Sequence, residues 1–209
     1  MIGDSKGSGA YSALKLMSKQ LNIEIGGLNL QGCWPVDYEV AGNIRKCNKW
    51  QKIRMKKALA SDYDTILLVA LWPEDISDAL KSQIEKILPH KNVIVLGKLP
   101  HFNTNVIDMV EGGRTLKTAS KSKEVKLLNG FKEQKAINDS LRGISENSGA
   151  YFISAYDELC IPKACPILDE SGKNLLYVDT HHLSLYGAKA LKAAMLPQME
   201  AFLKEVKRK

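Results

Sequence analysis

Short apolar runs alternate with longer amphipathic segments along the chain. Four of the runs have the length of a strand, are rich in β-branched residues and end at turn residues. They cover residues 23–30, 65–71, 92–96 and 150–154. Because runs of this kind are apolar on both faces, they predict strands of a parallel sheet that is buried between helices.

The segments between and after these runs are predicted helices. The intervening ones cover residues 9–20, 40–60, 75–88 and 130–148. After Ser184, a good N-cap residue, apolar residues recur every three or four positions and form one stripe. The stripe consists of Leu191, Met195, Met199, Phe202 and Val206. The alternation of strand and helix predicts an α/β fold, a three-layer α/β/α sandwich with a central, mostly parallel sheet and right-handed crossovers.

The length of 209 residues, with 44% hydrophobic and 25% charged residues, predicts a single domain over residues 1–209. The chain has no apolar run of about 18 residues and no secretory signal at its start. Only two residues precede Gly3, which leaves little room for a strand, so we expect the chain to be a fragment of a longer protein. The least regular stretch, residues 101–126, is expected to be a long loop near the site or over a sheet edge.

The formal net charge is +7, and basic residues gather in residues 45–57 and 114–126. A solvated helix face is the ordinary interpretation of such runs. Nucleic acid, an anionic glycan and a membrane surface are the alternatives. Trp50 is the one aromatic residue in the first run, and a single ring is no stacking platform for bases. Since the chain also lacks a nucleic-acid-binding motif, we expect no nucleic-acid partner.

The four cysteines form two sequence-local pairs, Cys33 with Cys47 and Cys160 with Cys165. Three pairings are conceivable, and a zinc site or four free thiols in a cytosolic protein are the alternatives. Neither pair has the two-residue spacing of a zinc knuckle, and no histidine lies near the first pair. We therefore favour two local disulfides, which would place the domain in an oxidising compartment.

Candidate chemistry lies where an open α/β sheet binds ligands, at the carboxyl ends of the strands. Residues 3–5, 31–33, 72–74 and 97–98 follow four predicted strands. In the first of these segments, Gly3, Asp4 and Ser5 precede a helix start of small residues. Such a turn exposes the serine hydroxyl and directs backbone N–H groups at a developing negative charge. The same three residues are also common in plain turns and N-caps.

A second segment supplies what a serine nucleophile needs. Asp179 and His182 are three residues apart on one predicted turn, so their side chains can meet. An imidazole takes the proton of the serine, and a carboxylate fixes the tautomer of the imidazole. The spacing from Asp179 selects His182, and we expect His181 to point elsewhere. Taken alone, two adjacent histidines before a helix are also typical of surface or capping positions.

These blocks resemble a known superfamily. Gly3-Asp4-Ser5 near the start and Asp179-x-x-His182 before the last helix are similar to the first and last blocks of the SGNH hydrolases, also called GDSL-type esterases and lipases. More narrowly, several segments resemble the SGNH domain that is fused to the membrane acyltransferase-3 family. They are residues 177–184 with Gly187-Ala188, Cys160-x4-Cys165, residues 32–35 with Cys47, and residues 96–100.

The resemblance implies an SGNH hydrolase fold of the flavodoxin-like kind and a role for each matching residue. Ser5 is expected to be the nucleophile, His182 the general base and then acid, and Asp179 its orienting partner. The backbone N–H groups of Ser5 and Gly32 are expected to form part of the oxyanion hole, although Gly32 also suits a plain turn.

The sequence departs from the superfamily pattern after the third strand. Residues 71–74 read Leu-Trp-Pro-Glu, where many SGNH hydrolases have an asparagine that donates to the oxyanion. The oxyanion hole is therefore expected to be incomplete or differently built. Trp72 is a candidate wall of the acyl or sugar pocket, with a buried structural tryptophan as the alternative.

The resemblance further implies O-acyl transfer, most often O-acetylation, to a cell-envelope polysaccharide through an acyl-Ser5 intermediate. The acyl donor would come from a membrane acyltransferase domain. The domain would then be periplasmic or extracytoplasmic and tethered to the inner membrane. A carbohydrate esterase is the close alternative, and a non-catalytic glycan-binding domain is an alternative of another class. No phosphate-cradling loop or metal-ligand cluster is evident, so we expect no cofactor and no metal.

Overall fold

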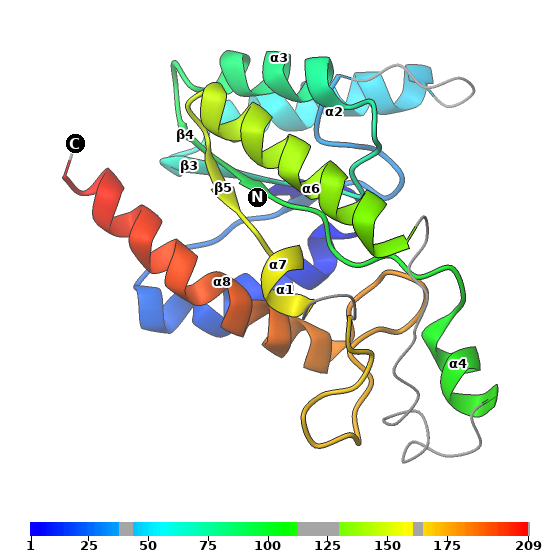
Figure 1. Ribbon diagram of the computed structural model, residues 1–209. Helices are drawn as coiled ribbons and strands as arrows, with labels where there is room; N and C mark the ends of the chain where they lie inside the picture. Colours follow the sequence, from blue (N-terminus) through cyan, green and yellow to red (C-terminus); the bar gives the residue numbers. More distant parts are fainter. Residues whose placement is uncertain (38–43, 113–129, 161–164, 209) are drawn as a thin grey trace.

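The computed structural model describes residues 1–37, 44–112, 130–160 and 165–208, and its centre is a five-stranded sheet (Figure 1). The order of the strands is β2-β1-β3-β4-β5, and every neighbouring pair is parallel. The strands are β1 (Ile2–Gly3), β2 (Leu28–Asn29), β3 (Thr65–Val69), β4 (Asn92–Leu96) and β5 (Tyr151–Ile153). The predicted α/β class with a parallel sheet is confirmed.

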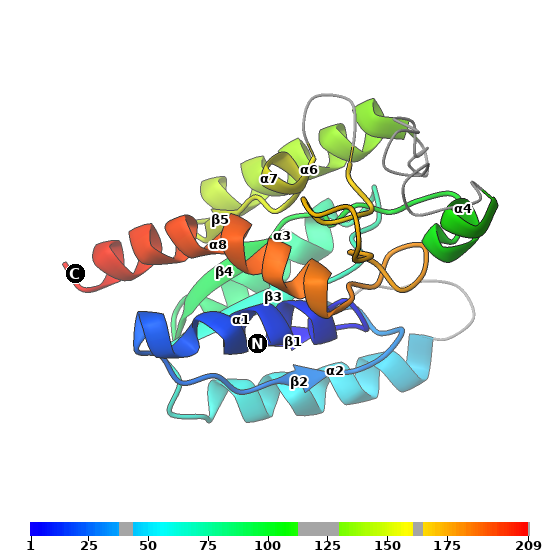
Figure 2. The same ribbon diagram turned by 90° about the horizontal axis from the view of Figure 1, so that it is seen from below.

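Helices cover both faces of the sheet. Helices α1 (Gly7–Leu21) and α8 (Leu185–Val206) lie side by side on one face (Figure 2). The other face carries α2 (Ile44–Leu59), α3 (Ser77–Ile87) and α6 (Gly130–Asn147). Two short helices, α4 (Val106–Gly112) and α7 (Tyr156–Leu159), belong to the connections. This arrangement is the predicted three-layer sandwich.

The core divides along the pleat of the sheet. In β3, Ile66 and Leu68 pack with residues of α2, α3 and α6. Their neighbours Leu67 and Val69 point to the opposite face and pack with α1 and α8. Successive side chains of a strand alternate between its faces, so a run that is apolar at every position buries both. This explains why these strands show no polar alternation in the sequence.

The predicted strand over residues 23–30 is shorter in the structure. Only Leu28 and Asn29 pair with β1, because β1 itself is two residues long. The predicted strand over residues 65–71 also ends early, at Val69. Two residues later, the N–H of Leu71 donates to the Asp4 carboxylate and so leaves the ladder.

The predicted loop over residues 101–126 contains a helix, α4, so that expectation was wrong for this part of the segment. The N–H of Ile107 donates to the Asn105 side chain, and Val106 is fully buried in a satellite core. One buried anchor and one local turn are too weak a periodic signal for a sequence pattern to show. Residues 113–126 and the first residues of the predicted helix over 40–60 lie outside the described residues.

Helix α8 begins as predicted. The Ser184 hydroxyl accepts the N–H of Gly187 at 3.1 Å, and all of the predicted stripe except the half-buried Val206 is buried. Gly187 faces the carbonyl oxygen of Leu176, which also accepts the N–H of Ser184. Within the described ranges, no helix is long and apolar enough to span a membrane.

Gly187→Ala should destabilise the domain, because its Cβ would overlap the backbone oxygen of Leu176. Overpacking against backbone costs about 1–3 kcal/mol or more. Gly143→Ala in α6 is the matched control, since no heavy atom lies within 4 Å of the added Cβ. There the helix propensity of alanine should add about 0.5–1 kcal/mol. Chemical unfolding measures both effects, and equal effects of the two changes would contradict the Leu176 contact.

Candidate active site

Ser5 lies on the turn between β1 and α1, at the carboxyl edge of the sheet. The buried carboxylate of Asp4 organises this turn by accepting the N–H of Lys6 and the N–H of Leu71, both at 2.8 Å. The second bond ties the turn to the chain that leaves β3. Burial raises the pKa of Asp4, and the two N–H groups act in the opposite direction. The buried Asp4 side chain therefore fixes the conformation of the turn that presents Ser5.

Asp179 folds the second turn of the site through one of its oxygens. Its Oδ1 accepts the N–H of His181 and the N–H of His182, both at 2.8 Å. A side chain that accepts N–H groups two and three residues ahead stabilises a turn without help from a sheet. The turn is closed by the N–H of Val178, which donates to the carbonyl of His182 at 2.9 Å.

The other oxygen of Asp179 begins a chain of hydrogen bonds that ends at Ser5. Asp179 Oδ2 lies 2.6 Å from His182 Nδ1, and His182 Nε2 lies 2.8 Å from Ser5 Oγ. When Nδ1 carries the proton that the carboxylate accepts, Nε2 is free to accept the serine proton. The structure thus brings together the three side chains that the sequence singled out, although 177 positions separate Ser5 from His182.

The carboxylate in this chain is held in its charged form. Burial alone would raise the pKa of Asp179, but the N–H groups of His182 and His181 and the His182 ring lower it well below its usual range. A charged Asp179 keeps the proton on Nδ1 of His182 and stabilises the imidazolium that forms when Nε2 takes a proton.

His181 does not contact Ser5. Its Nδ1 lies 2.7 Å from the Thr180 hydroxyl, and its ring meets His101 edge-on with centroids 4.9 Å apart. Burial, followed by the nearby Lys6 ammonium, lowers the pKa of His181 to about 4, so the ring is neutral at pH 7. The structure places His182, not His181, between the carboxylate and the serine.

Lys6 connects the two turns. Its side chain is 2% exposed, and its Nζ donates to the carbonyl oxygen of His181 at 2.5 Å. Burial lowers the pKa of Lys6 to about 7, while the Asp4 carboxylate favours the charged form; Lys98 adds to the lowering and Asp179 opposes it. The sequence interpretation missed Lys6, and the one available signal was a lysine directly after Ser5 in a start of small residues.

Two further buried cations stabilise the carboxyl edge. Lys98, which follows β4, donates from Nζ to the carbonyl of Trp72 at 3.1 Å. Arg54 of α2 donates to the carbonyls of Gly3 at 2.8 Å and Cys33 at 3.0 Å. The position of Lys98 was singled out as a strand end, whereas Arg54 was counted only as part of a basic run. Its spacing from the buried Gln51 marks the inward face of α2.

The expected oxyanion donors have free N–H groups. Among the described residues, neither the N–H of Ser5 nor that of Gly32 has a hydrogen-bond partner. Gly32 has a φ of +70°, a backbone conformation that favours glycine, in a turn closed by the N–H of Cys33 on the carbonyl of Leu30. Its turn geometry alone therefore accounts for a glycine at this position.

Trp72 does not form a pocket wall. It is 1% exposed and packs in the core under α2, α3 and α6. Its Nε1–H donates to the carbonyl of Leu96 at 2.8 Å, which satisfies the indole inside the protein. The alternative of a buried structural tryptophan is confirmed and the pocket wall is wrong, because the indole is buried and bonds to the carbonyl at the end of β4.

Both predicted disulfides are present, Cys33–Cys47 and Cys160–Cys165. The first joins the turn after β2 to the start of α2. The second joins Cys160, the residue directly after α7, to Cys165. No free cysteine occurs in the part of the chain that the structure describes.

The turn formed by residues 179–182, which we call the acid–histidine turn, also has the composition of a metal site. Ligand atoms of Asp179, His181 and His182 lie within 4.8 Å of one another. Asp179 Oδ2 and His182 Nδ1, two atoms that such a site could use, are already hydrogen-bonded to each other. A metal at this position would therefore have to break the chain of hydrogen bonds that leads to Ser5.

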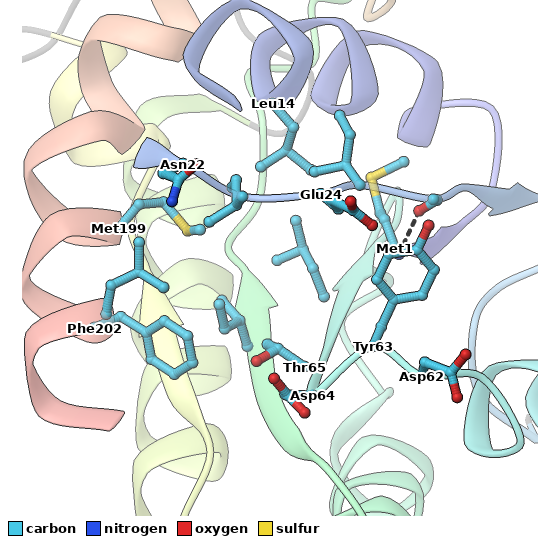
Figure 3. Close-up of a pocket in the computed structure, with 16 residues that line it drawn as sticks. Met1, Leu14, Asn22, Glu24, Asp62, Tyr63, Asp64, Thr65, Met199 and Phe202 are labelled. Carbon is cyan, nitrogen blue, oxygen red and sulfur yellow. Dashed lines mark hydrogen bonds between the residues drawn. The ribbon is translucent and has the colours of Figure 1, made fainter. Parts of the chain in front are cut away.

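A separate cavity of about 370 Å³ lies at the opposite, amino edge of the sheet (Figure 3). Met1 and Thr65, which precede or begin β1 and β3, line it together with Tyr63 and with Phe202 of α8. Its lining does not include Ser5 or the acid–histidine turn. This cavity is therefore distinct from the candidate active site.

The fold and the two facing turns define the class of the protein, an SGNH-type α/β domain with a serine at the carboxyl edge of its sheet. The family model described as "SGNH domain (fused to AT3 domains)" matches residues 1–197. The chain belongs to this family. A comparison with curated proteins gave no match.

Solved structures share the fold. The periplasmic domain of a lipopolysaccharide acetyltransferase from Salmonella ser. Paratyphi A has a TM-score of 0.76 at 20% identity, covering 95% of this chain and 82% of that one. A GDSL-like lipase from Bacteroides thetaiotaomicron has a TM-score of 0.56 at 12% identity, covering 96% and 86%. An acetyl xylan esterase has a TM-score of 0.56 at 12% identity, covering 94% and 97%.

Lys6→Met should separate stability from activity. Burying an ammonium is costly and methionine has a similar length, so the free energy of unfolding should stay within about 1 kcal/mol of the parent value. The turnover of a small acetyl ester should fall at least about tenfold, because the acid–histidine turn loses its hydrogen bond from Lys6 to the turn that carries Ser5. Thermal unfolding and steady-state kinetics measure the two effects.

Lys98→Met is the matched control for Lys6→Met. It removes a second buried ammonium at the same edge, but that ammonium contacts the carbonyl of Trp72 and not the acid–histidine turn. Ester turnover should remain near the parent value. Equal losses in the two variants would show that buried charge in general, and not the contact with His181, supports the site.

Proposed function

We propose that this domain transfers an acyl group, most simply acetyl, to a hydroxyl of a cell-envelope polysaccharide through an acyl-Ser5 intermediate. One observation carries the proposal, the chain of hydrogen bonds from Asp179 through His182 to Ser5, with distances of 2.6 Å and 2.8 Å. A serine next to a neutral imidazole nitrogen, with a carboxylate on the other ring nitrogen, is the arrangement that nucleophilic acyl transfer needs.

In this mechanism His182 takes up and returns one proton in each of two steps. Its Nε2 takes the proton of Ser5 as Oγ attacks the acyl carbonyl, and Asp179 stabilises the imidazolium. The N–H groups of Ser5 and Gly32 hold the oxyanion of the tetrahedral intermediate. When the intermediate collapses, His182 returns the proton to the leaving group of the donor. The acceptor hydroxyl then attacks the acyl-Ser5 carbonyl, with His182 again accepting the proton. His182 returns this proton to Ser5 Oγ as the bond between Oγ and the acyl carbon breaks and the acylated acceptor leaves.

The family and the disulfides support the cellular setting that we propose. The matched family consists of SGNH domains fused to acyltransferase-3 domains, so a membrane acyltransferase domain is the proposed source of the acyl group. Two disulfides favour an oxidising compartment. We therefore place the domain on the periplasmic or other extracytoplasmic side, tethered to the inner membrane through the acyltransferase domain.

An esterase that removes acyl groups from a carbohydrate is the second candidate. The same three side chains hydrolyse an ester when water takes the place of the sugar hydroxyl. The fold is shared with an acetyl xylan esterase as well as with an acetyltransferase domain. A glycan-binding domain without catalysis is less favoured, because binding alone does not require a serine, an imidazole and a carboxylate in one hydrogen-bonded chain.

Ser5→Ala should abolish turnover of an activated acetyl ester without changing the thermal unfolding transition. Loss of a triad member typically lowers the rate by about three orders of magnitude or more. His182→Ala should be nearly as damaging. His181→Ala is the matched control and should be mild, because its ring contacts Thr180, His101 and the ring of His182 but not Ser5. The reverse order of the two histidine variants would refute the proposed assignment.

The choice between transfer and hydrolysis depends on which hydroxyl reaches acyl-Ser5. An enzyme built for transfer positions a sugar hydroxyl better than water. We expect the isolated domain to be a slow esterase that diverts acyl groups to an added envelope glycan, with O-acetylated product detected by mass spectrometry. Ser5→Ala should yield no such product. Fast hydrolysis with every acceptor, together with release of acetate from acetylated glycans, would establish the esterase instead.

A further inference from the structure

Helix α2 is rich in basic residues and contains no acidic residue. The chain has 30 Lys and Arg residues and 23 Asp and Glu residues. Seven of the basic residues lie in α2 and no acidic residue does, so the remaining 23 basic residues equal the acidic ones in number. The seven are Arg45, Lys46, Lys49, Lys52, Arg54, Lys56 and Lys57. Helix α2 therefore carries a formal charge of +7, equal to the net charge of the whole chain.

Helix α2 has one face that is buried against the sheet and one face that is exposed. Gln51, Arg54, Met55 and Ala58 are buried against the sheet. The outward residues are exposed, and we call them the α2 basic face: Lys49, Trp50, Lys52, Lys56 and Lys57. At 3.6 residues per turn, these five positions span an arc of about 160° on the helix. Arg54, by contrast, is buried and donates hydrogen bonds to backbone carbonyls inside the fold.

Nothing in the described part of the chain neutralises this face. None of its four lysines takes part in an ion pair there, whereas Lys81 and Lys86 of α3 and Lys135 of α6 pair with acidic residues. Lys49, Lys52 and Lys56 follow one another at spacings of three and four residues, where like charges repel. An ordinary solvated helix face mixes both signs of charge. This face instead favours an external anionic partner.

The shape and composition of the α2 basic face select the kind of partner. Trp50 is 45% exposed, although tryptophan is a large apolar residue. Trp and Lys together are typical of protein surfaces that lie at the headgroup level of anionic bilayers. The face is the convex side of one helix at the edge of the molecule, beside the edge strand β2 (Figure 2), and such a surface fits a plane better than a single chain.

We propose that the α2 basic face docks the domain side-on onto an anionic phospholipid surface. This inference is independent of the proposed acyl transfer. The sheet would then lie beside the membrane. Its carboxyl edge, which carries Ser5, would point parallel to the membrane surface. Helices α1 and α8, on the opposite face of the sheet, would point away. The site would remain open to a polymer while staying close to the bilayer.

Vesicle co-sedimentation of the 209-residue chain tests the proposal. Phosphatidylcholine vesicles containing a quarter phosphatidylglycerol should bind the domain, and pure phosphatidylcholine vesicles should not. Binding should weaken with added salt, because screening shortens the reach of the lysines. Changing Lys49, Lys52, Lys56 and Lys57 to Gln should lower the apparent affinity at least about tenfold. The emission of Trp50 should shift to shorter wavelength on binding, and Trp50→Phe should remove this shift.

A variant with the same charge change on the opposite face is the control. Lys15, Lys19, Lys204 and Lys207 are exposed lysines of α1 and of the end of α8, and changing them to Gln should leave vesicle binding near the parent value. Both variants should keep the circular dichroism spectrum and the thermal unfolding transition of the parent, which shows that they fold. Equal loss of binding in both, or retention by a soluble acidic polysaccharide without vesicle binding, would overturn the proposal.

Discussion

The site depends on one carboxylate that performs two tasks with two oxygens. Oδ1 of Asp179 folds the turn by accepting the N–H groups of His181 and His182, and Oδ2 orients the ring of His182 toward Ser5. The separation of three residues between Asp179 and His182 serves both tasks, because Asp179 accepts the backbone N–H of His182 and is also hydrogen-bonded to its ring. Replacing this carboxylate would therefore remove the shape of the turn as well as the charge.

Two turns that are far apart in sequence must meet at one edge of the sheet. The parallel sheet brings the end of β1 to its interior, between β2 and β3, and Asp4 fastens the turn that carries Ser5 to the residue that leaves β3. Lys6 then connects that turn to the carbonyl of His181. A buried ammonium costs folding free energy, which the nearby Asp4 and Asp179 carboxylates offset in part. Burial of the Lys6 ammonium thus lowers the stability of the fold but helps to fix the position of the His182 imidazole.

Features with a repeating or local cause were predictable from the sequence. The strands and helices follow from apolar periodicity, and the choice of His182 over His181 follows from the reach of Asp179. The two disulfides follow from the separations of 14 and 5 residues between their cysteines. Features that depend on which way one side chain points were not predictable. Trp72 shows this, because its position after β3 suits a pocket wall, yet its indole is satisfied inside the core.

Arg54 and the α2 basic face show why a count of charges says little until the helix is placed. Lys52, Arg54 and Lys56 are close in sequence, but the rotation of 100° per residue puts the middle one under the helix and the others on its outside. The buried guanidinium donates to carbonyls at the ends of β1 and of the turn after β2, so it fixes α2 against the edge of the sheet that carries Ser5. The inward contact thereby fixes the direction in which the outward lysines point, and any partner that binds them is oriented relative to the active site.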